Sequence, residues 1–377
     1  MKRYLLLLLV LTLSFAATFA ADESTITIKT SKPVGTSVSL DAYTSSKDEA
    51  FTVDWGDGEE KIYNIDPNGW GYSRRINTEI KGGTITIKGK LVNLDLTKAG
   101  ITSIELHGQT AMKTINLKEN EIAIFAQDGM PALTELNLRD NKLTKFTGTG
   151  MTSLKTLNLQ GNQLDSHELD ITDASATLTE LNVSDNGDKF INLNLMSFTA
   201  LEYFYCDDNP EFTTAVFADN SENIEKISMN NCHVMHFYSR SFPNLSSLNL
   251  SNNALFELEE GNYPKLSTLS IDHNYLTTLD VTRFPKLYNL SCGNNNITLL
   301  NVGSNPELNS LNCDSLDITK LDLSNNKDLA YLSVNGTKLT QLDIRGKKSI
   351  TRLNISNTAI RYIDLEDQYS LRDFRAR

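Results

Sequence analysis

The chain has 377 residues, of which 40% are hydrophobic, and a formal net charge of −12 at pH 7. This acidic balance disfavours nonspecific binding to nucleic-acid phosphates and to anionic membrane surfaces, because both are negatively charged themselves. Nucleic acid is therefore not expected as a partner.

The first segment, residues 1–20, predicts a signal peptide. Lys2 and Arg3 precede a long apolar run that ends in small residues suited to cleavage. Cleavage before Ala21 would remove these two positive charges and take the formal charge from −12 to −14. No second apolar run approaches the roughly 18 residues of a membrane span, and the first cysteine, Cys206, is far from the cleavage point of a lipid-anchored protein. We expect export without a transmembrane segment, to the periplasm, the cell surface or the medium.

The next segment, residues 21–90, predicts a small antiparallel β unit that is sandwich-like. Apolar and polar residues alternate in four short stretches, separated by Gly, Pro and Asn: Thr25 to Lys29, Ser37 to Leu40, Phe51 to Trp55 and Thr84 to Lys88. The last stretch continues into the following segment without a linker. Because the first coil of a repeat protein needs cover, we expect this unit to cap the repeats.

One motif in this unit resembles a known family. The stretch Phe51-Thr52-Val53-Asp54-Trp55-Gly56-Asp57-Gly58 resembles the W-D-F-G-D-G hairpin of PKD-type immunoglobulin-like domains, although here Asp54 precedes Trp55. Its Asp-Gly steps favour a tight turn. The resemblance implies an immunoglobulin-like fold and says little about function. We expect Trp55 to pack into the core of the unit.

The remaining segment, residues 91–377, repeats the pattern L-x-x-L-x-[LIVC]. Fourteen repeats start at Leu91, Met112, Leu133, Leu154, Leu178, Leu201, Ile224, Leu245, Leu266, Leu287, Leu308, Leu329, Ile350 and Leu371. The step is 21 residues except for steps of 24, 23 and 23 between Leu154 and Ile224. A fixed period in the twenties with this pattern is the signature of leucine-rich repeats. The segment predicts a solenoid of about fourteen coils with a parallel β-sheet on one face, and the extra residues in the outer loops of coils four to six.

The ninth position of each repeat predicts a structural ladder. It is Asn in eight of the thirteen complete repeats, at Asn120, Asn141, Asn162, Asn186, Asn209, Asn253, Asn274 and Asn295. An amide carries both a donor and an acceptor, so it can satisfy the backbone groups that the turn after each strand leaves away from water.

The second half of each coil has only about ten residues, too few for much helix, and predicts an outer side of short strand or extended chain. It carries a column of acids: Glu105, Glu259, Asp280, Asp322, Asp343 and Asp364. These carboxylates either collect a divalent cation or cap their own turns in contact with solvent. We favour turn capping.

No cofactor, metal site or enzymatic activity is expected. His233 and His236 are the only close pair of histidines and lack the H-E-x-x-H pattern, and neither a nucleophile elbow nor a phosphate loop is present. The four cysteines occupy repeat positions that favour small apolar residues. We expect buried thiols, and a disulfide between Cys292 and Cys313 remains open.

Outward positions that break the repeat pattern predict where a partner binds. The fifth position is Asn in the four coils before coil six, at Asn116, Asn137, Asn158 and Asn182, but coil six presents Glu202, Tyr203, Tyr205, Asp207 and Asp208. Tyrosine offers a large contact area with few torsions, which suits a binding hot spot. The alternative is that these tyrosines cover their own loop. A second patch is predicted at His273, Tyr288 and Tyr331.

The competing hypothesis is glycan binding by residues 21–90. Trp70 and Tyr72 lie on a glycine-flanked loop where a sugar ring could stack, and the repeats would then be a scaffold.

Nearly all of the chain after residue 20 resembles the short leucine-rich repeats of secreted and surface proteins from Gram-negative gut and oral bacteria, which often follow a small DWGDG-containing domain. This resemblance implies an interaction protein without catalytic residues, in some members one that adheres to host surfaces. The sequence therefore predicts a recognition protein that binds an extracellular or host protein, or a polysaccharide.

Overall fold

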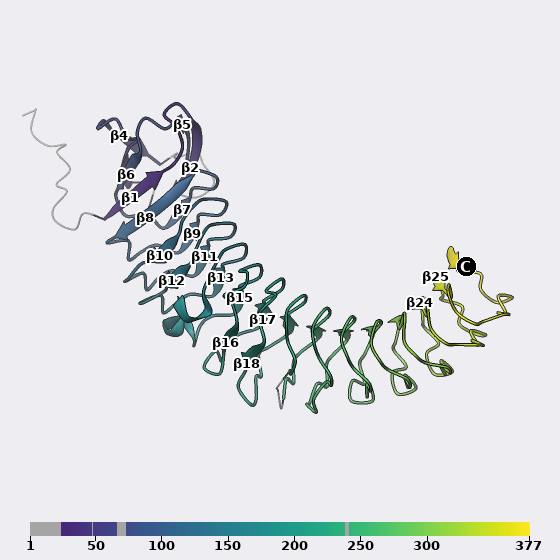
Figure 1. Ribbon diagram of the computed structural model, residues 1–377. Helices are drawn as coiled ribbons and strands as arrows, with labels where there is room; N and C mark the ends of the chain where they lie inside the picture. The colour runs from purple at the N-terminus through teal and green to yellow at the C-terminus, as the bar shows by residue number, and fades with distance from the viewer. Residues whose placement is uncertain (1–23, 47, 66–72, 238–240) are drawn as a thin grey trace, which may run out of the picture.

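The structure is a computed structural model that describes residues 24–46, 48–65, 73–237 and 241–377. The chain forms a curved, mainly β solenoid with an antiparallel cap at its N-terminal end (Figure 1). This confirms the predicted fold class. The helices of the described residues are two 3₁₀ turns, η1 (Ser166–Glu168) and η2 (Thr172–Ala174). None of the helices in this part of the chain is long and apolar enough to cross a membrane.

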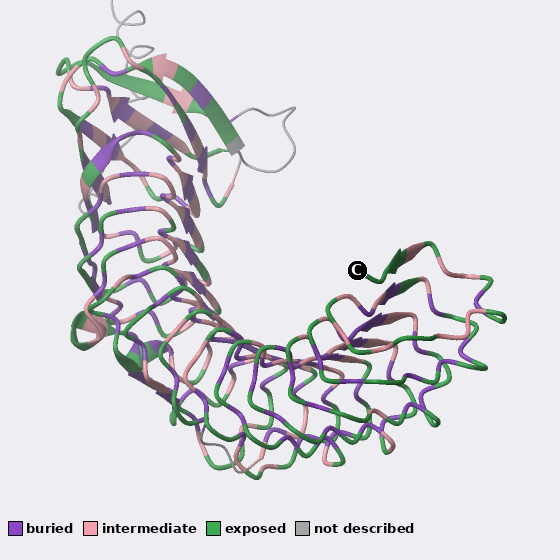
Figure 2. Cartoon of the chain, turned by 45° about the vertical axis from the view of Figure 1, so that its right-hand side comes forward, coloured by how far each residue is buried: buried purple, intermediate pink, exposed green. Residues whose placement is uncertain are grey.

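The main sheet contains one three-residue parallel strand for each predicted repeat, and each strand begins two residues after the repeat start. The strands are β7 (Asn93–Asp95), β9 (Thr114–Asn116), β11 (Glu135–Asn137), β13 (Thr156–Asn158), β15 (Glu180–Asn182), β17 (Tyr203–Tyr205), β19 (Lys226–Ser228), β20 (Ser247–Asn249), β21 (Thr268–Ser270), β22 (Asn289–Ser291), β23 (Ser310–Asn312), β24 (Tyr331–Ser333), β25 (Arg352–Asn354) and β26 (Asp373–Arg375). Neighbouring strands pair equivalent residues of adjacent coils, as Leu136 does with Leu157. The middle residue of each strand from β7 to β25 points into the core, so one apolar row runs along the solenoid as far as the last coil (Figure 2).

The outer side of the early coils forms short parallel strands, and later coils have extended turns there. The outer strands are β10 (Ile124–Ala126), β12 (Lys145–Thr147), β14 (Leu169–Asp170), β16 (Asn192–Asn194) and β18 (Thr214–Val216). The two 3₁₀ turns lie in coil four, where the step of 24 residues provides the extra chain. This agrees with the expected outer side of short strand and extended chain.

The cap is continuous with the solenoid. Its strands are β1 (Thr25–Thr30), β2 (Ser37–Tyr43), β3 (Ala50–Asp54), β4 (Glu60–Asn64), β5 (Ser73–Glu79) and β6 (Thr84–Lys88), joined by β8 (Ile101–His107) from the first coil. One sheet has the order β4-β3-β6-β1-β8, while β5 and β2 extend the main sheet beyond β7. Each of the two sheets of the cap therefore contains strands from both sides of residue 90. The four alternating stretches all form strands, whereas β4 and β5 were not predicted, and β4 has four of its five residues exposed.

The hairpin between β3 and β4 explains the Asp-Trp-Gly motif. The Asp54 carboxylate accepts a hydrogen bond of 2.8 Å from the N–H of Gly56, whose φ is +106°. A Cβ on Gly56 would lie 2.5 Å from the backbone of Gly82, so the turn requires glycine there. Trp55 is 1% exposed, and its Nε1 donates to the Tyr63 hydroxyl over 3.1 Å. The prediction that Trp55 packs into the core is confirmed.

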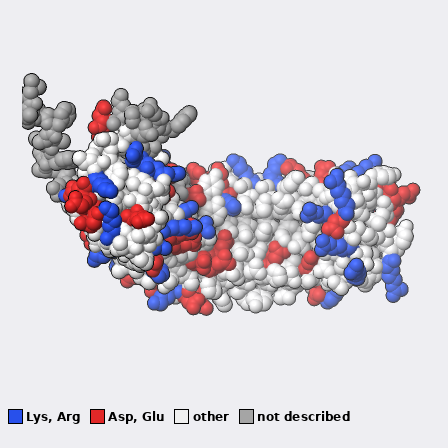
Figure 3. Space-filling view, turned by 90° about the horizontal axis from the view of Figure 1, so that it is seen from above, with Lys and Arg blue, Asp and Glu red and all other residues white. Residues whose placement is uncertain are grey.

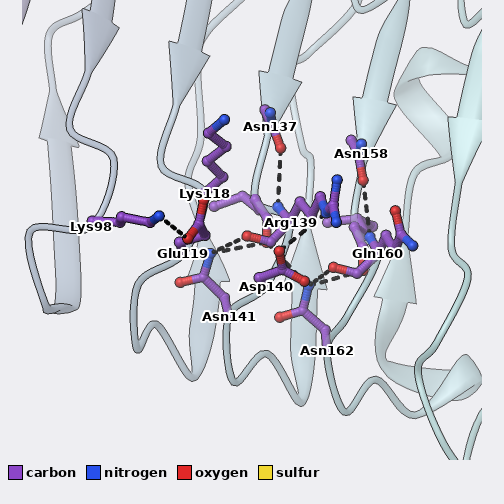
Figure 4. Close-up of polar contacts among 12 residues, drawn as sticks. Lys98, Lys118, Glu119, Asn137, Arg139, Asp140, Asn141, Asn158, Gln160 and Asn162 are labelled. Atoms are coloured by element: carbon purple, nitrogen blue, oxygen red, sulfur yellow. Dashed lines mark hydrogen bonds and ion pairs between the residues drawn. The ribbon is translucent and has the colours of Figure 1, made fainter.

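The predicted asparagine ladder is present. The Asn274 Nδ2 donates to the carbonyls of Leu250 at 2.9 Å and Ile271 at 3.1 Å, and its Oδ1 accepts from the N–H of Leu255 at 3.0 Å. Equivalent bonds recur along the solenoid, as at Asn141 and Asn162 (Figure 4). Each amide thus joins its own turn to the preceding coil.

A second buried column on the outer side was not predicted. It begins with the aromatic residues Phe242, Tyr263 and Phe284, whose ring centroids are 6.1 and 5.7 Å apart. It then changes to Asn305 and Asn326, which are fully buried. The Asn326 Nδ2 donates to the carbonyls of Val302 and Asn305 at 3.1 and 2.8 Å, so a second amide ladder replaces the aromatic stack.

The four cysteines are free thiols. Cys206, Cys292 and Cys313 are buried, and Cys232 is partly buried. Burial raises the pKa of the Cys292 and Cys313 thiols, which keeps them protonated and weakly nucleophilic. The structure therefore shows buried thiols rather than the Cys292–Cys313 disulfide that the sequence left open.

Candidate binding surface

The main sheet lines the concave side of the solenoid (Figure 1). We define the concave strip as the outward residues at the second, third and fifth positions of the fourteen repeats. In coils one to seven it carries the acids Asp95, Glu135, Glu180, Glu202 and Glu225 and the lysines Lys113, Lys155 and Lys226.

The rest of the concave strip divides into an uncharged and a basic part. In coils eight to twelve it has no charged residue and consists largely of Ser, Thr and Asn. In the last two coils it carries Arg352, Arg372 and Arg375 with Asp373. Figure 3, which views the molecule from above, shows the largely uncharged middle and the basic groups toward the C-terminal end.

Asparagines at the fifth position have a local structural role. The Oδ1 atoms of Asn137 and Asn158 each accept a 3.1 Å hydrogen bond from the N–H two residues later (Figure 4). This is an Asx turn, which bends the chain at the end of each strand. The recurrence of Asn in this column is therefore explained by the fold alone.

In three of the four coils with serine at the fifth position, an aspartate of the preceding coil takes over the turn. The Asp207 Oδ1 accepts from the Ser228 hydroxyl at 2.6 Å and from the N–H of Asn230 at 2.7 Å. Asp272 and Asp314 make the same pair of contacts to the coils that follow them. The carboxylate of Asp207, predicted to contact a partner, thus joins coils six and seven. The signal for this role was the pairing of Asp at the seventh position with Ser at the fifth position of the next repeat.

The two tyrosines of β17 extend toward coil seven. The Tyr203 hydroxyl donates to the Glu225 carboxylate over 2.9 Å, and this hydrogen bond raises the pKa of Tyr203. The Lys226 Nζ lies 5.0 Å from the centre of the Tyr205 ring, within the range of a cation–π contact. Both rings are half-buried, and they contact the next coil rather than closing over their own loop. Glu225 and Lys226 were not predicted as part of this cluster.

Glu202 is half-buried and directly precedes β17. Asp208 lies in the turn that follows β17, and His273 lies in the equivalent turn that follows β21. At this eighth position the backbone is left-handed, with φ of +59° at Asp208 and +53° at His273. The same conformation recurs in the other complete coils, at Lys98, Glu119, Asp140, Gly161, Asp185, Asn231, Asn252, Asn294, Ser315, Gly336 and Asn357. Asn, Asp and Gly tolerate this region best, which accounts for much of the composition there.

The structure does not gather His273, Tyr288 and Tyr331 into one cluster. His273 follows β21, Tyr288 precedes β22, and Tyr331 begins β24. His273 is exposed, and its Nε2 lies 3.2 Å from the Asn294 Nδ2. Tyr288 is 46% exposed. Tyr331 lines a shallow recess with the C-terminal arginines Arg352 and Arg375.

The predicted glycan-binding residues Trp70 and Tyr72 lie outside the described residues. Four of the six acids in the outer column cap turns, which is the interpretation we favoured. The carboxylates of Asp280, Asp322, Asp343 and Asp364 each accept a hydrogen bond of 2.9 to 3.0 Å from the N–H two residues later. Glu105 lies on β8 in the cap sheet, and Glu259 lies 3.5 Å from His236.

Comparison with known proteins supports the repeat assignment. A family model described as leucine-rich repeats in two copies matches residues 131–170. Among curated proteins, none matches this sequence.

Solved structures share the fold at low identity. The functional domain of InlJ from Listeria monocytogenes, described as including a cysteine ladder, is 22% identical with a TM-score of 0.59, and the match covers 79% of this chain and 66% of that one. The Leptospira interrogans protein LIC12759 is 20% identical with a TM-score of 0.56, covering 70% and 72%. The Drosophila Toll–Spätzle complex gives 18% identity and a TM-score of 0.53, covering 71% and 45%. The chain spans less than two thirds of the first and third of these chains. Its repeats, its parallel sheet and these neighbours together identify the fold as a leucine-rich-repeat solenoid with an antiparallel β cap.

Proposed function

We propose that this protein is a recognition protein that binds another protein along the concave strip. The observation that carries the proposal is the break in the fifth column at coil six. Asn at this position caps a turn, but Tyr205 cannot, and the fold replaces the lost cap with the Ser184 hydroxyl, which accepts from the N–H of Asp207 over 3.0 Å. The tyrosine therefore stands where the fold alone favours asparagine.

The chemistry of the concave strip supports a protein partner. Tyr203 and Tyr205 offer aromatic area beside Glu202, Glu225 and Lys226, a composition typical of binding hot spots. The separation of an acidic from a basic end fits a partner with the opposite arrangement, because complementary charge orients an incoming protein. Solenoids of this class are generally interaction scaffolds with extended concave surfaces, and the Toll–Spätzle neighbour is itself a complex of two proteins.

We further propose that the protein is exported and acts outside the cytoplasm, in adhesion or a related interaction. The support is the predicted signal peptide at residues 1–20, which lies outside the described part of the chain. The PKD-like character of the cap also remains a prediction, for which the Asp54 hairpin is the support.

The test is binding of the purified protein to an array of extracellular matrix proteins and soluble polysaccharides. We expect saturable binding to a protein, weakened about tenfold or more in the double variant Tyr203→Ala/Tyr205→Ala, since hot-spot tyrosines contribute about 2 kcal/mol or more each. The matched control is Tyr362→Ala/Tyr369→Ala, because these tyrosines are 79% and 84% exposed and lie outside the concave strip.

Unchanged protein binding in the first double variant, or equal loss in the control, would contradict the proposal. Binding confined to polysaccharides and abolished by Trp70→Ala would instead favour the glycan hypothesis.

A further inference from the structure

Three metal-binding side chains converge on the outer side of coils seven and eight, away from the concave strip. His236, Glu257 and Glu259 each offer one ligand atom, and these atoms all lie within 4.8 Å of one another. The His236 Nδ1 is 3.5 Å from the Glu259 Oε1. Two atoms bound to one zinc ion at 2.0–2.1 Å in tetrahedral geometry stand about 3.4 Å apart. The spacing of this pair therefore suits a shared metal ion.

The fold dictates that these side chains meet. His236 and Glu257 are 21 residues apart, at the same repeat position of adjacent coils, and equivalent positions lie about one strand spacing apart. Glu259 follows Glu257 by two residues, which in extended chain places both side chains on one side. The equivalent residues of the flanking coils are Thr213 and Thr278.

In the described part of the chain, the Arg283 guanidinium beside this cluster bonds to main-chain oxygens rather than to the carboxylates. Arg283 approaches Glu259, but its guanidinium donates to the main-chain oxygens of Glu259 at 3.0 Å and Leu258 at 3.1 Å. The site thus combines one imidazole with two carboxylates, and neutral imidazole gives it two negative charges. His236 and Glu257 are exposed and Glu259 is partly buried, so an ion can reach them from solvent.

We propose that His236, Glu257 and Glu259 bind a divalent transition-metal ion, with zinc as the best match. Imidazole nitrogen favours zinc over calcium, which prefers oxygen ligands only. Three protein ligands leave the fourth tetrahedral position to water. The bound ion joins coil seven to coil eight on the side opposite the main sheet.

The test is isothermal titration calorimetry of the chelator-treated, untagged protein with ZnCl₂ and, separately, with CaCl₂. We expect one saturable zinc site and no comparable calcium site. His236→Ala, Glu257→Gln and Glu259→Gln should each weaken zinc binding about tenfold or more, as loss of groups that hold a metal typically does.

Three variants serve as matched controls that should retain zinc binding: His233→Ala and Glu260→Gln, which alter exposed neighbours, and Cys232→Ser, which removes the partly buried thiol of the same coil. At one zinc concentration, zinc should also raise the melting temperature of the wild type more than that of Glu257→Gln. Absence of a saturable site, zinc affinity in the three ligand variants unchanged from that of the wild type, or loss of binding in any of the three controls would overturn the proposal.

Discussion

At the scale of the residue, most of the regular columns of this solenoid satisfy backbone groups. The ninth-position asparagines bond to neighbouring turns, the fifth-position asparagines cap the strand ends, and the eighth-position residues adopt left-handed backbone. A residue that departs from its column without a structural reason is therefore a candidate for a role in binding. Tyr205 is such a residue, whereas Asp207 has a clear structural role.

The ladder makes a direct prediction for Asn274→Ala. The substitution strands the carbonyls of Leu250 and Ile271 and the N–H of Leu255 away from water. We expect the free energy of unfolding to fall by about 1–3 kcal/mol, the cost of leaving buried polar groups unpaired. Urea denaturation followed by circular dichroism measures this. Asn296→Ala, at an exposed position of the next coil, is the control and should have little effect. An unchanged midpoint for Asn274→Ala would contradict the structural role of the ladder.

At the scale of the element, the outer turns depend on ionised aspartates. Hydrogen bonds from Thr282, Ser324 and Arg345 lower the pKa of Asp280, Asp322 and Asp343 below the ordinary value. Because the folded pKa lies below the unfolded one, the stabilisation is fully present above the unfolded value of about 3.9 and is lost as the pH falls below it toward the folded pKa values.

The triple variant Asp280→Asn/Asp322→Asn/Asp343→Asn tests this dependence. Asn keeps the acceptor oxygen but does not titrate, and the fold already uses Asn301 in this way, with its Oδ1 accepting from the N–H of Gly303 over 3.0 Å. We expect similar stability at pH 7 and a smaller loss between pH 4 and 2 than in the wild type. Thermal melts across this range are the measurement, and identical acid profiles would show that these turns do not contribute.

At the scale of the whole molecule, the cap and the repeats share two sheets. β2 pairs with both β5 and β7, and β1 pairs with both β6 and β8. Separating the cap from the first coil would break both sheets and expose apolar residues such as Leu94 and Ile104, which are 1% and 3% exposed. The two parts should therefore be thermodynamically coupled.

We predict that the cap and the first coils unfold in one transition. Both tryptophans precede residue 91, so tryptophan fluorescence reports on the cap while far-ultraviolet circular dichroism reports mainly on the repeats. The two denaturation midpoints should coincide within error, as expected for a cooperative unit. A cap transition clearly separated from that of the repeats would show that the shared sheets do not couple them.

The sequence by itself determined the class of fold, the start of every repeat and the asparagine ladder. These features depend on local periodicity, because each coil must bury the same apolar positions against its neighbours. The alternating strands of the cap were predictable for the same reason, while β4 was not, since it buries little.

Only the tertiary structure decided which outward residues meet, because contacts between coils join side chains about 21 residues apart whose roles no single repeat reveals. It assigned Asp207 to the turn of the next coil, placed Glu225 and Lys226 beside the tyrosines, and separated His273 from Tyr288 and Tyr331. It also brought Glu257 and Glu259 to His236, where the sequence offered only a pair of histidines without a metal-binding pattern. Stacking fixes the distance between coils, and the pairing of particular side chains across that distance decides the chemistry of the surface.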